Sequence, residues 1–535
     1  MSRRVFLSLA RLAFLQFTLG IALSPPSLAQ EWALRVKPTG TLRVAHLDYA
    51  AWSAMYNYAE GLVTLDKDNS LAPCLAQDWR WIDEKTIEFK LREGVRFHTG
   101  ERFNAQAVRV NWEAYKRLET PRLFRFLVLS DETIFEIIDD YKVQFTFPEP
   151  DGLAFVKFVM LLQIAPAFFA EHRFDENNWG YLREAGPWGT GPFKVVEGSL
   201  RYVRPSDRVV LEAYEDYLDP RYPKVKRVIY DQSLIGNRKE AMRLCREEEG
   251  AVDIVTFIRP LDTLKVAESP YAKVVKSKDA TLLVGTTNQR KKDSKWRDAW
   301  LREALNYAIN RKELWKYGAK GNAYNLGGSI PPGAHGHNPN LTLYTYDTTK
   351  ARSLLAEAGY PDGFEVKIIT PEAWKLETQI MKRMLERIGL KVRFDVLTFP
   401  EYFRKIFIPI LDKPPEEQDW DSAITHRMDW WGHAGASFLP WYLGDNELRW
   451  NEYDPVYDKM WKDMATTVDP VVQEEKIQQM VQYLHDRAYN IYIYSPLTLY
   501  AVNKEVNFVP EKFQGLRFKE ASVTDNHWSV RAEKK

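Results

Sequence analysis

The stretch FKLREGVRFHTGERFNAQAV, residues Phe89–Val108, contains signals for a strand, a turn and the start of a helix, and it contains no catalytic motif. Together with the residues before it, TIEFKL alternates the apolar Ile87, Phe89 and Leu91 with polar neighbours, the pattern of a half-buried strand. A basic and acidic turn follows. Asn104 is a suitable N-cap for a helix whose apolar residues recur on one face. The stretch therefore predicts a strand, a turn and a helix in direct succession.

The same kinds of element alternate along most of the chain. KVQFTF predicts a second strand, and IIDDYKVQF places the adjacent carboxylates of Asp139 and Asp140 in a turn before it rather than in an acid and base pair. Helical patterns occupy LREALNYAINRKELW and TTKARSLLAEAG, the latter closed by Gly359. QIMKRMLERIG then leads into the strand pattern LKVRFDV. The sequence predicts a chain of the α/β class.

Composition restricts the partners. The 535 residues contain 74 Lys and Arg against 73 Asp and Glu, so the chain has no broad positive field with which to hold nucleic acid. Aromatic residues make up 13% of the chain and include 18 Trp, which supply rigid surfaces for a ligand or a core. We therefore expect the partner to be a small solute or another protein.

The first 29 residues have the pattern of an export signal. Arg3 and Arg4 form a positive start, Leu12–Leu23 is mostly apolar, and SLAQ offers a cleavage site before Gln30. SRRVFLS is also similar to the twin-arginine pattern, so both the general and the twin-arginine routes remain open. A membrane anchor is the alternative, but the apolar run is short for a bilayer. We expect a cleaved, soluble, periplasmic protein.

The residues that commonly carry chemistry are sparse. The phosphate-binding, dinucleotide-binding, zinc-protease and serine-hydrolase motifs are absent from the sequence, which predicts no cofactor and no enzymatic activity. The two cysteines, Cys74 and Cys245, lie far apart, and two buried thiols are favoured over a single bridge. His335 and His337 share the loop GAHGHNP, but no third ligand is identifiable. No metal site is predicted.

The opening stretch also carries a family resemblance. LAPCLAQDWRWIDEKTIEFKLREGVRFHTGERFNAQAV resembles the signature of the family 5 extracellular solute-binding proteins, the oligopeptide, dipeptide and nickel-binding group of ABC importers. EGLVTLDKDNSLAP, GTGPFKVV, LREALNYAINRKEL and YDTTKARSLLAEAGYPDGFEV resemble further family segments in the same order. The chain departs from the pattern at Ala107, where the family usually has Asp. The residues that match the signature are Pro73, Leu75, Ala76, Trp79, Leu91, Arg92, Gly94, Val95, Phe97, His98 and Gly100.

This resemblance implies a two-lobed, periplasmic-binding-protein-like α/β fold with an additional third domain and a ligand cleft between the lobes. On the resemblance, the signature belongs to the additional domain and His98 is structural. The implied division is lobe I at residues 30–71, 189–282 and 497–535, the additional domain II at 72–188, and lobe III at 283–496.

The resemblance also implies the function. The protein would be the periplasmic substrate-binding component of an ABC importer, a monomer that closes around a small solute and delivers it to the membrane permease. A peptide or peptide-like solute is favoured. A receptor of the same fold for an opine, a sugar or a metal chelate is the first alternative, and an exported hydrolase is the alternative from another class.

The ligand site is expected in WDSAITHRMDWWGHAGASF of the second lobe and HLDYAAWSAM of the first. In peptide-binding members an acidic residue near this position pairs with the peptide ammonium, which makes Asp429 a candidate; an Asp satisfied by Arg427 or by a turn is the alternative. Trp430 and Trp431 point to opposite sides if extended, so at most one would face the ligand. The candidate ligand-binding residues are Asp429, Arg427, Trp430, Trp431, Tyr49 and Trp52.

Overall fold

The computed structural model describes residues 35–46, 50–116, 128–171, 186–198, 207–278, 280–407, 413–446, 449–512 and 516–534. The predicted export signal at residues 1–29 and the candidate Tyr49 lie outside these residues. Trp52 lies in a described helix, but its side chain is not described. Within the described ranges no helix combines the length and the apolar character needed to cross a membrane.

The first of three main sheets, here the β1 sheet, collects strands from both ends of the chain. Its strand order is β12-β19-β11-β1-β10-β9-β8, and β1 pairs in parallel with both β10 and β11. Helices α2 (Ala50–Tyr58), α6 (Arg238–Glu247), α7 (Asp262–Ala267) and α16 (Trp528–Glu533) accompany it. The strands are β1 Thr39–Ala45, β8 Phe193–Glu197, β9 Arg208–Ala213, β10 Val225–Asp231, β11 Ile254–Val255, β12 Ala272–Ser277 and β19 Thr498–Asn503.

The second, the β13 sheet, has the order β14-β18-β13-β17-β15-β16. Its strands are β13 Thr281–Thr287, β14 Ala323–Tyr324, β15 Glu365–Pro371, β16 Lys391–Leu397, β17 Ser422–Met428 and β18 Asn490–Pro496. Its helices are α8 Ala299–Ala308, α9 Arg311–Tyr317, α10 Thr348–Glu357, α11 Lys375–Glu386, α12 Phe399–Phe407, α13 Ala434–Ser437, α14 Pro455–Ala465 and α15 Pro470–Asp486, with short 3-10 turns η4 Lys295–Arg297, η5 Glu372–Trp374, η7 Pro415–Glu417 and η8 Leu439–Tyr442.

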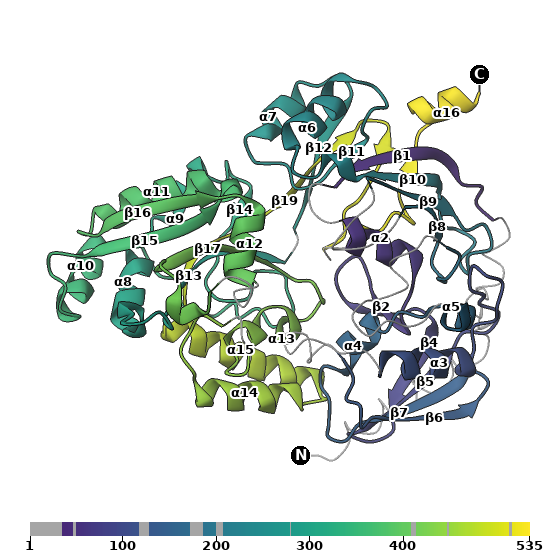
Figure 1. Ribbon diagram of the computed structural model, residues 1–535, viewed down its shortest axis with the longest axis horizontal. Coiled ribbons are helices and arrows are strands. Elements are labelled where there is room, and N and C mark those ends of the chain that lie inside the picture. The colour runs from purple at the N-terminus through teal and green to yellow at the C-terminus, as the bar shows by residue number, and fades with distance from the viewer. Residues whose placement is uncertain are drawn as a thin grey trace, which may run out of the picture.

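The chain passes between these two sheets twice. β12 ends at Ser277 and β13 begins at Thr281. β18 ends at Pro496 and β19 begins at Thr498, with only Leu497 between them. Figure 1 shows the β13 sheet with its helices on one side and the β1 sheet on the other, joined by these strands. Alternate residues of β13 enter different cores, Leu283 on one face and Leu282 and Val284 on the other. The β13 sheet is therefore buried on both faces.

The third sheet, the β5 sheet, contains the stretch that opened the sequence analysis. Its order is β4-β5-β7-β6, with β4 Ala76–Trp81, β5 Thr86–Leu91, β6 Ile134–Asp139 and β7 Lys142–Thr146. Asn104 caps α3 (Ala105–Tyr115), accepting a hydrogen bond from the amide of Ala107 at 3.0 Å. Helices α4 (Ala154–Met160) and α5 (Pro166–Glu171) and the hairpin β2 (Val63–Leu65) and β3 (Leu71–Pro73) complete this part.

His98 joins the signature stretch to the GTGPF segment. Its ring nitrogen Nε2 lies 2.8 Å from the carbonyl of Gly191, and its amide donates to the carbonyl of Gly189 at 2.8 Å. A Cβ at Gly189 would lie 1.9 Å from the carbonyl oxygen of Tyr58, so only glycine fits there. Burial lowers the pKa of His98 to about 3, which keeps the imidazole neutral. These contacts give His98 a packing role.

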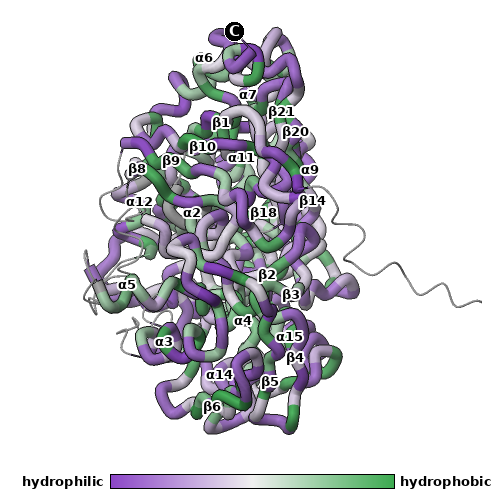
Figure 2. The backbone as a smooth tube through the Cα atoms, turned by 90° about the vertical axis from the view of Figure 1, so that its right-hand side faces the viewer, coloured by the Kyte–Doolittle hydropathy of each residue, from purple (hydrophilic) through white to green (hydrophobic). Residues whose placement is uncertain are grey.

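One local prediction differs from the structure. The pattern LREALNYAINRKELW forms two helices rather than one, α8 and α9, because Asn310 leaves the helical conformation and its side chain accepts a hydrogen bond from the amide of Glu313 at 3.2 Å. The turn predicted at Asp139 and Asp140 does separate β6 from β7. Figure 2 shows β8, α5 and α3 near the left-hand edge of the view, with hydrophilic and hydrophobic residues interspersed along the chain. The short strands β20 (Val506–Asn507) and β21 (Ser522–Val523) lie near the C-terminus.

Candidate functional site

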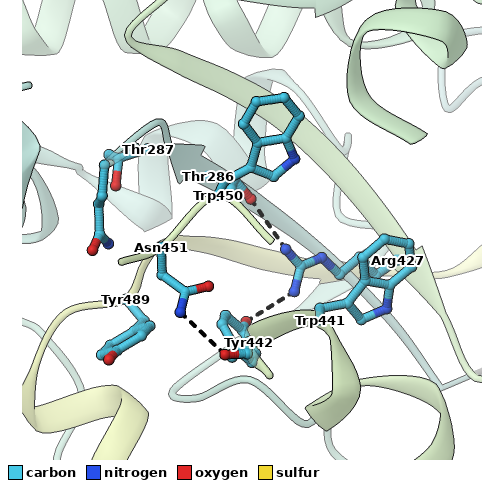
Figure 3. A pocket seen from close by; sticks show the side chains of 9 residues that line it. Thr286, Thr287, Arg427, Trp441, Tyr442, Trp450, Asn451 and Tyr489 are labelled. Carbon is cyan, nitrogen blue, oxygen red and sulfur yellow. Dashed lines mark hydrogen bonds between the residues drawn. The ribbon is translucent and has the colours of Figure 1, made fainter. Parts of the chain in front are cut away.

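A pocket partly open to solvent is lined by residues of the paired strands β13 and β17 and of segments that follow them. Figure 3 shows the guanidinium of Arg427 among aromatic and polar side chains in this pocket. Most of its lining is polar or aromatic, which suits a small polar solute. The lining residues are Thr286, Thr287, Gln289, Arg427, Trp441, Tyr442, Trp450, Asn451 and Tyr489.

Strand pairing and one short helix assemble this pocket. β13 and β17 are antiparallel, and Arg427 lies opposite Leu282 in their register. The 3-10 turn η8 then brings Trp441 and Tyr442 back over the sheet. The amide side chain of Asn451 donates to the carbonyl of Tyr442 at 3.1 Å and fixes that return. The pocket thus combines segments that are distant in the sequence.

Arg427 is the charged group of the pocket. It is only 6% exposed. Its Nη1 donates to the hydroxyl of Tyr442 at 2.9 Å, and its Nη2 donates to the hydroxyl of Thr286 at 3.3 Å. The guanidinium carbon also lies 5.3 Å from the ring centre of Trp441 and 5.2 Å from that of Tyr442. Both acceptors are neutral, so the cation is held by dipoles and aromatic faces.

Asp429 follows β17 directly and is fully buried. Asn69 Nδ2 donates to its Oδ2 at 2.9 Å, the amide of Trp431 donates to Oδ1 at 3.2 Å, and the hydroxyl of Ser437 also donates to Oδ1. Burial raises the pKa of the Asp429 carboxyl, and these hydrogen bonds oppose that shift. Neutral groups of the protein therefore occupy both carboxylate oxygens.

The predicted site residues take different positions. Arg427 and Asp429 are close in sequence, but Arg427 bonds to Tyr442 and Thr286 and forms no ion pair with Asp429. Trp430 and Trp431 are both half-buried. The side chain of Trp431 packs against a small apolar cluster of Val156 and Ala436.

The region around Asp429 contacts the part of the chain that holds the β5 sheet. Asn69 comes from the β2–β3 connection. The amide of Gly152 donates to the carbonyl of Ala465 at 2.7 Å, and Gln473 Nε2 donates to the carbonyl of Gly152 at 3.0 Å. The carboxylate of Asp429 thus joins two parts of the molecule.

The histidine and cysteine candidates do not form a metal site. His337 Nδ1 bonds to the carbonyl of Ile330 at 3.1 Å, whereas the ring of His335 lies 4.7 Å from that of His433. Within the described ranges no group of three or more His, Cys, Asp or Glu residues could hold a metal ion. Both cysteines are free thiols. Cys245 is buried as expected, but Cys74 is only partly buried.

Sequence reasoning missed most of the pocket. Trp441, Tyr442 and Trp450 lie in runs with no recognisable motif, and Tyr489 precedes β18 far along the chain. The one signal was the segment TLLVGTTNQ, which contains Thr286, Thr287 and Gln289 at the end of a fully buried strand. The register places Thr286 and Thr287 opposite Ala423 and Ser422, and the side chain of Arg427 reaches Thr286 through its Nη2.

The chain belongs to the bacterial extracellular solute-binding proteins, family 5, whose model matches residues 70–448. Among curated relatives, the glutathione-binding protein GsiB of Escherichia coli is 28% identical over 352 residues, and that of Pectobacterium atrosepticum is 29% identical over 352 residues. In both comparisons the match covers 63% of this chain and 63% of the relative. The matched segment thus spans less than two thirds of these relatives.

Solved structures share the fold at lower identity. One is the periplasmic binding protein DppA of Helicobacter pylori in complex with the peptide STSA, with a TM-score of 0.73 at 20% sequence identity. The superposition covers 93% of this chain and 100% of the DppA chain. Another is AgaA of Agrobacterium tumefaciens in complex with agropinic acid, with a TM-score of 0.70 at 21% sequence identity. The superposition covers 91% of this chain and 99% of the AgaA chain. The expected two-lobed α/β fold is confirmed.

Proposed function

We propose that the protein is the substrate-binding component of an ABC importer and that it delivers a peptide or peptide-like solute to a membrane permease. Membership of family 5 over residues 70–448 carries this proposal. The peptide bound to DppA and the glutathione-binding relatives support the solute class. On this proposal the protein acts in the periplasm as a monomer without enzymatic activity, after removal of residues 1–29 by the general or the twin-arginine route.

The proposed mechanism is closure of two lobes by a hinge. Lobe I comprises residues 30–71, 189–282 and 497–535, domain II residues 72–188, and lobe III residues 283–496. The short connections between β12 and β13 and between β18 and β19 are the proposed hinge, because few residues there need to change conformation. A solute that contacts both lobes favours the closed form by its differential affinity for it.

The proposed solute contacts are Arg427, one of Trp430 and Trp431, and Tyr49 and Trp52 from the opposite lobe. Pairing of Asp429 with a peptide ammonium stays a prediction. The donors around its carboxylate favour the alternative, in which Asp429 holds the turn after β17 and the contact with Asn69.

Mass spectrometry of the solute that copurifies after gentle extraction tests this function. We expect peptides, and we expect adding them at about 100 times their dissociation constant to stabilise the protein by about 2.7 kcal/mol. X-ray scattering should show a more compact particle with bound peptide. Superimposable profiles would contradict hinge closure, and absence of any peptide binding would contradict the solute class.

An opine is the second candidate, favoured by the fold shared with AgaA and its bound agropinic acid. Measuring the melting temperature with agropinic acid and with peptides separates the two solute classes. Sugars and metal chelates are tested alongside, and turnover of generic ester, glycoside or peptide substrates would indicate a hydrolase instead.

A further inference from the structure

The Arg427 pocket contains hydrogen-bond donors that the protein itself does not use. Arg427 Nε, Trp450 Nε1 and the hydroxyl of Thr287 are all buried, and none has a hydrogen-bond partner in the described part of the chain. All three residues line the same pocket. Buried polar groups in folded proteins are nearly always paired, so unpaired donors around one pocket point to an acceptor that arrives from outside.

The charge of the pocket indicates which acceptor this is. Within the described ranges no carboxylate forms an ion pair with Arg427. The neighbouring carboxylate of Asp429 accepts from Asn69, Trp431 and Ser437 instead. A buried cation without a counter-charge is costly, and the rings of Trp441 and Tyr442 compensate only part of that cost. An anion would complete the site.

We propose that this pocket is a carboxylate-recognition site. A guanidinium offers more N–H donors than the two hydroxyl acceptors of Tyr442 and Thr286 use, and its planar edge matches the two oxygens of a carboxylate. Trp450 Nε1 and Thr287 supply neutral donors beside it.

This inference deepens the proposed function, because it names the solute class as compounds that carry a free carboxylate, such as the end of a peptide. Only one part of this inference rests on the proposed function, namely that the bound carboxylate belongs to the transported solute. The affinity of the pocket for a carboxylate can be measured independently.

The probe is N-acetylglycine, which carries a carboxylate and no ammonium, and its matched neutral probe is N-acetylglycinamide. Saturation-transfer NMR titrations of the full mature protein at pH 7 give both dissociation constants. Loss of one partner of a buried charged pair typically weakens binding by about 30-fold or more, so we expect the acid to bind at least about tenfold more tightly than the amide.

Variants locate the site. Arg427→Gln should abolish the preference for the acid. Trp450→Phe keeps an aromatic ring but removes its N–H, and should weaken acid binding about 3- to 10-fold. Trp420→Phe is the matched control. The ring centre of Trp420 lies 4.5 Å from that of Trp450, and its Nε1 is also buried without a partner in the described chain, but it does not line the pocket.

A second pair of variants avoids changing an aromatic ring. Thr287→Val removes the hydroxyl that lines the pocket and should weaken acid binding. Ser422→Ala removes an equally buried and unpaired hydroxyl that does not line it, and should leave binding unchanged.

Equal affinity for acid and amide, or an acid preference that survives in Arg427→Gln, would overturn the proposal. A preference lost equally in Trp450→Phe and Trp420→Phe would also overturn it, because the effect would then come from packing. If N-acetylglycine binds as expected but no peptide does, the carboxylate site stands and the peptide function fails.

Discussion

Arg427 and Asp429 are opposite charges separated by a single residue at the end of β17, and the protein treats them differently. Asp429 is fully buried and its two oxygens accept hydrogen bonds from Asn69, Trp431 and Ser437. Arg427 is nearly as buried, yet its Nε has no partner in the described chain and it faces a pocket. Burial alone therefore does not distinguish a charge that stabilises the fold from one that binds a solute. The two differ in whether groups of the protein satisfy all of their hydrogen-bonding atoms.

This difference separates stability from binding. Removing a charge whose partners belong to the protein leaves those partners unpaired, so folding should suffer. Removing a charge whose remaining partner is a solute should leave the unliganded protein nearly as stable as before. The first four predictions measure these effects from the largest to the smallest.

Asp429→Ala should have the largest effect on stability. The donors of Asn69, Trp431 and Ser437 would lose their acceptor in a buried region, which should cost about 2 to 4 kcal/mol of the free energy of unfolding. Urea unfolding of the unliganded protein measures this cost. Asp68→Ala is the control, because Asp68 is exposed and its pair with Lys512, 3.2 Å away, should contribute less than about 1 kcal/mol.

The pH dependence of Asp429→Asn tests the burial of the same carboxyl. Burial raises the pKa of Asp429 in the folded state, so the folded protein binds its proton more tightly than the unfolded chain does. The stability that this tighter proton binding contributes is fully present below the unfolded pKa of about 4, and it is lost as pH rises through the higher pKa of the folded state. The difference in free energy of unfolding between wild type and Asp429→Asn should therefore shrink as pH rises. If this difference instead grows with pH, the folded protein stabilises the ionised form of Asp429.

Asn69→Gly should have a smaller effect. Asn69 has a positive φ of 68°, so glycine removes the side chain without straining the backbone. Loss of its hydrogen bond to Asp429 should cost about 1 kcal/mol. Hydrogen exchange should rise in the β2–β3 hairpin and in the turn after β17. Exchange that rises in the hairpin alone would contradict a contact shared by the two parts.

Arg427→Gln should change the stability of the unliganded protein least, by less than about 1 kcal/mol. The hydrogen bonds to Tyr442 and Thr286 would be lost, but so would the cost of burying a cation without a counter-charge. A loss comparable to that of Asp429→Ala in the same urea series would mean that Arg427 is primarily structural.

The sequence predicted the fold better than the site. The strand at TIEFKL and the cap at Asn104 depend on neighbouring residues, and the structure confirms both. The strand is not half-buried as its alternation predicted, because only Lys90 of its six residues is exposed. The family signature extended those local patterns to the two-lobed architecture. The break between α8 and α9 was missed because Asn310 interrupts an otherwise continuous helical pattern with a cap.

The pocket could not be predicted in the same way. Arg427 was a candidate because it lies in the segment expected to bind the solute. Tyr442 reaches it through η8, and Tyr489 directly precedes β18, which pairs with β13. Trp450 is held there by the amide of Gln289, which donates to its carbonyl at 2.8 Å. The partner of Asp429 was equally hidden, since Asn69 lies far away in the sequence. Long-range geometry of this kind leaves no local pattern.

The most direct test measures two quantities on Arg427→Gln and Asp429→Asn: the dissociation constant for N-acetylglycine and the melting temperature of the unliganded protein. We expect Arg427→Gln to lose at least about tenfold in affinity with little change in melting. We expect Asp429→Asn to melt at a lower temperature while its affinity stays within about threefold of wild type. The reverse pattern, with affinity lost in Asp429→Asn and melting lost in Arg427→Gln, would contradict the roles assigned to the two charges.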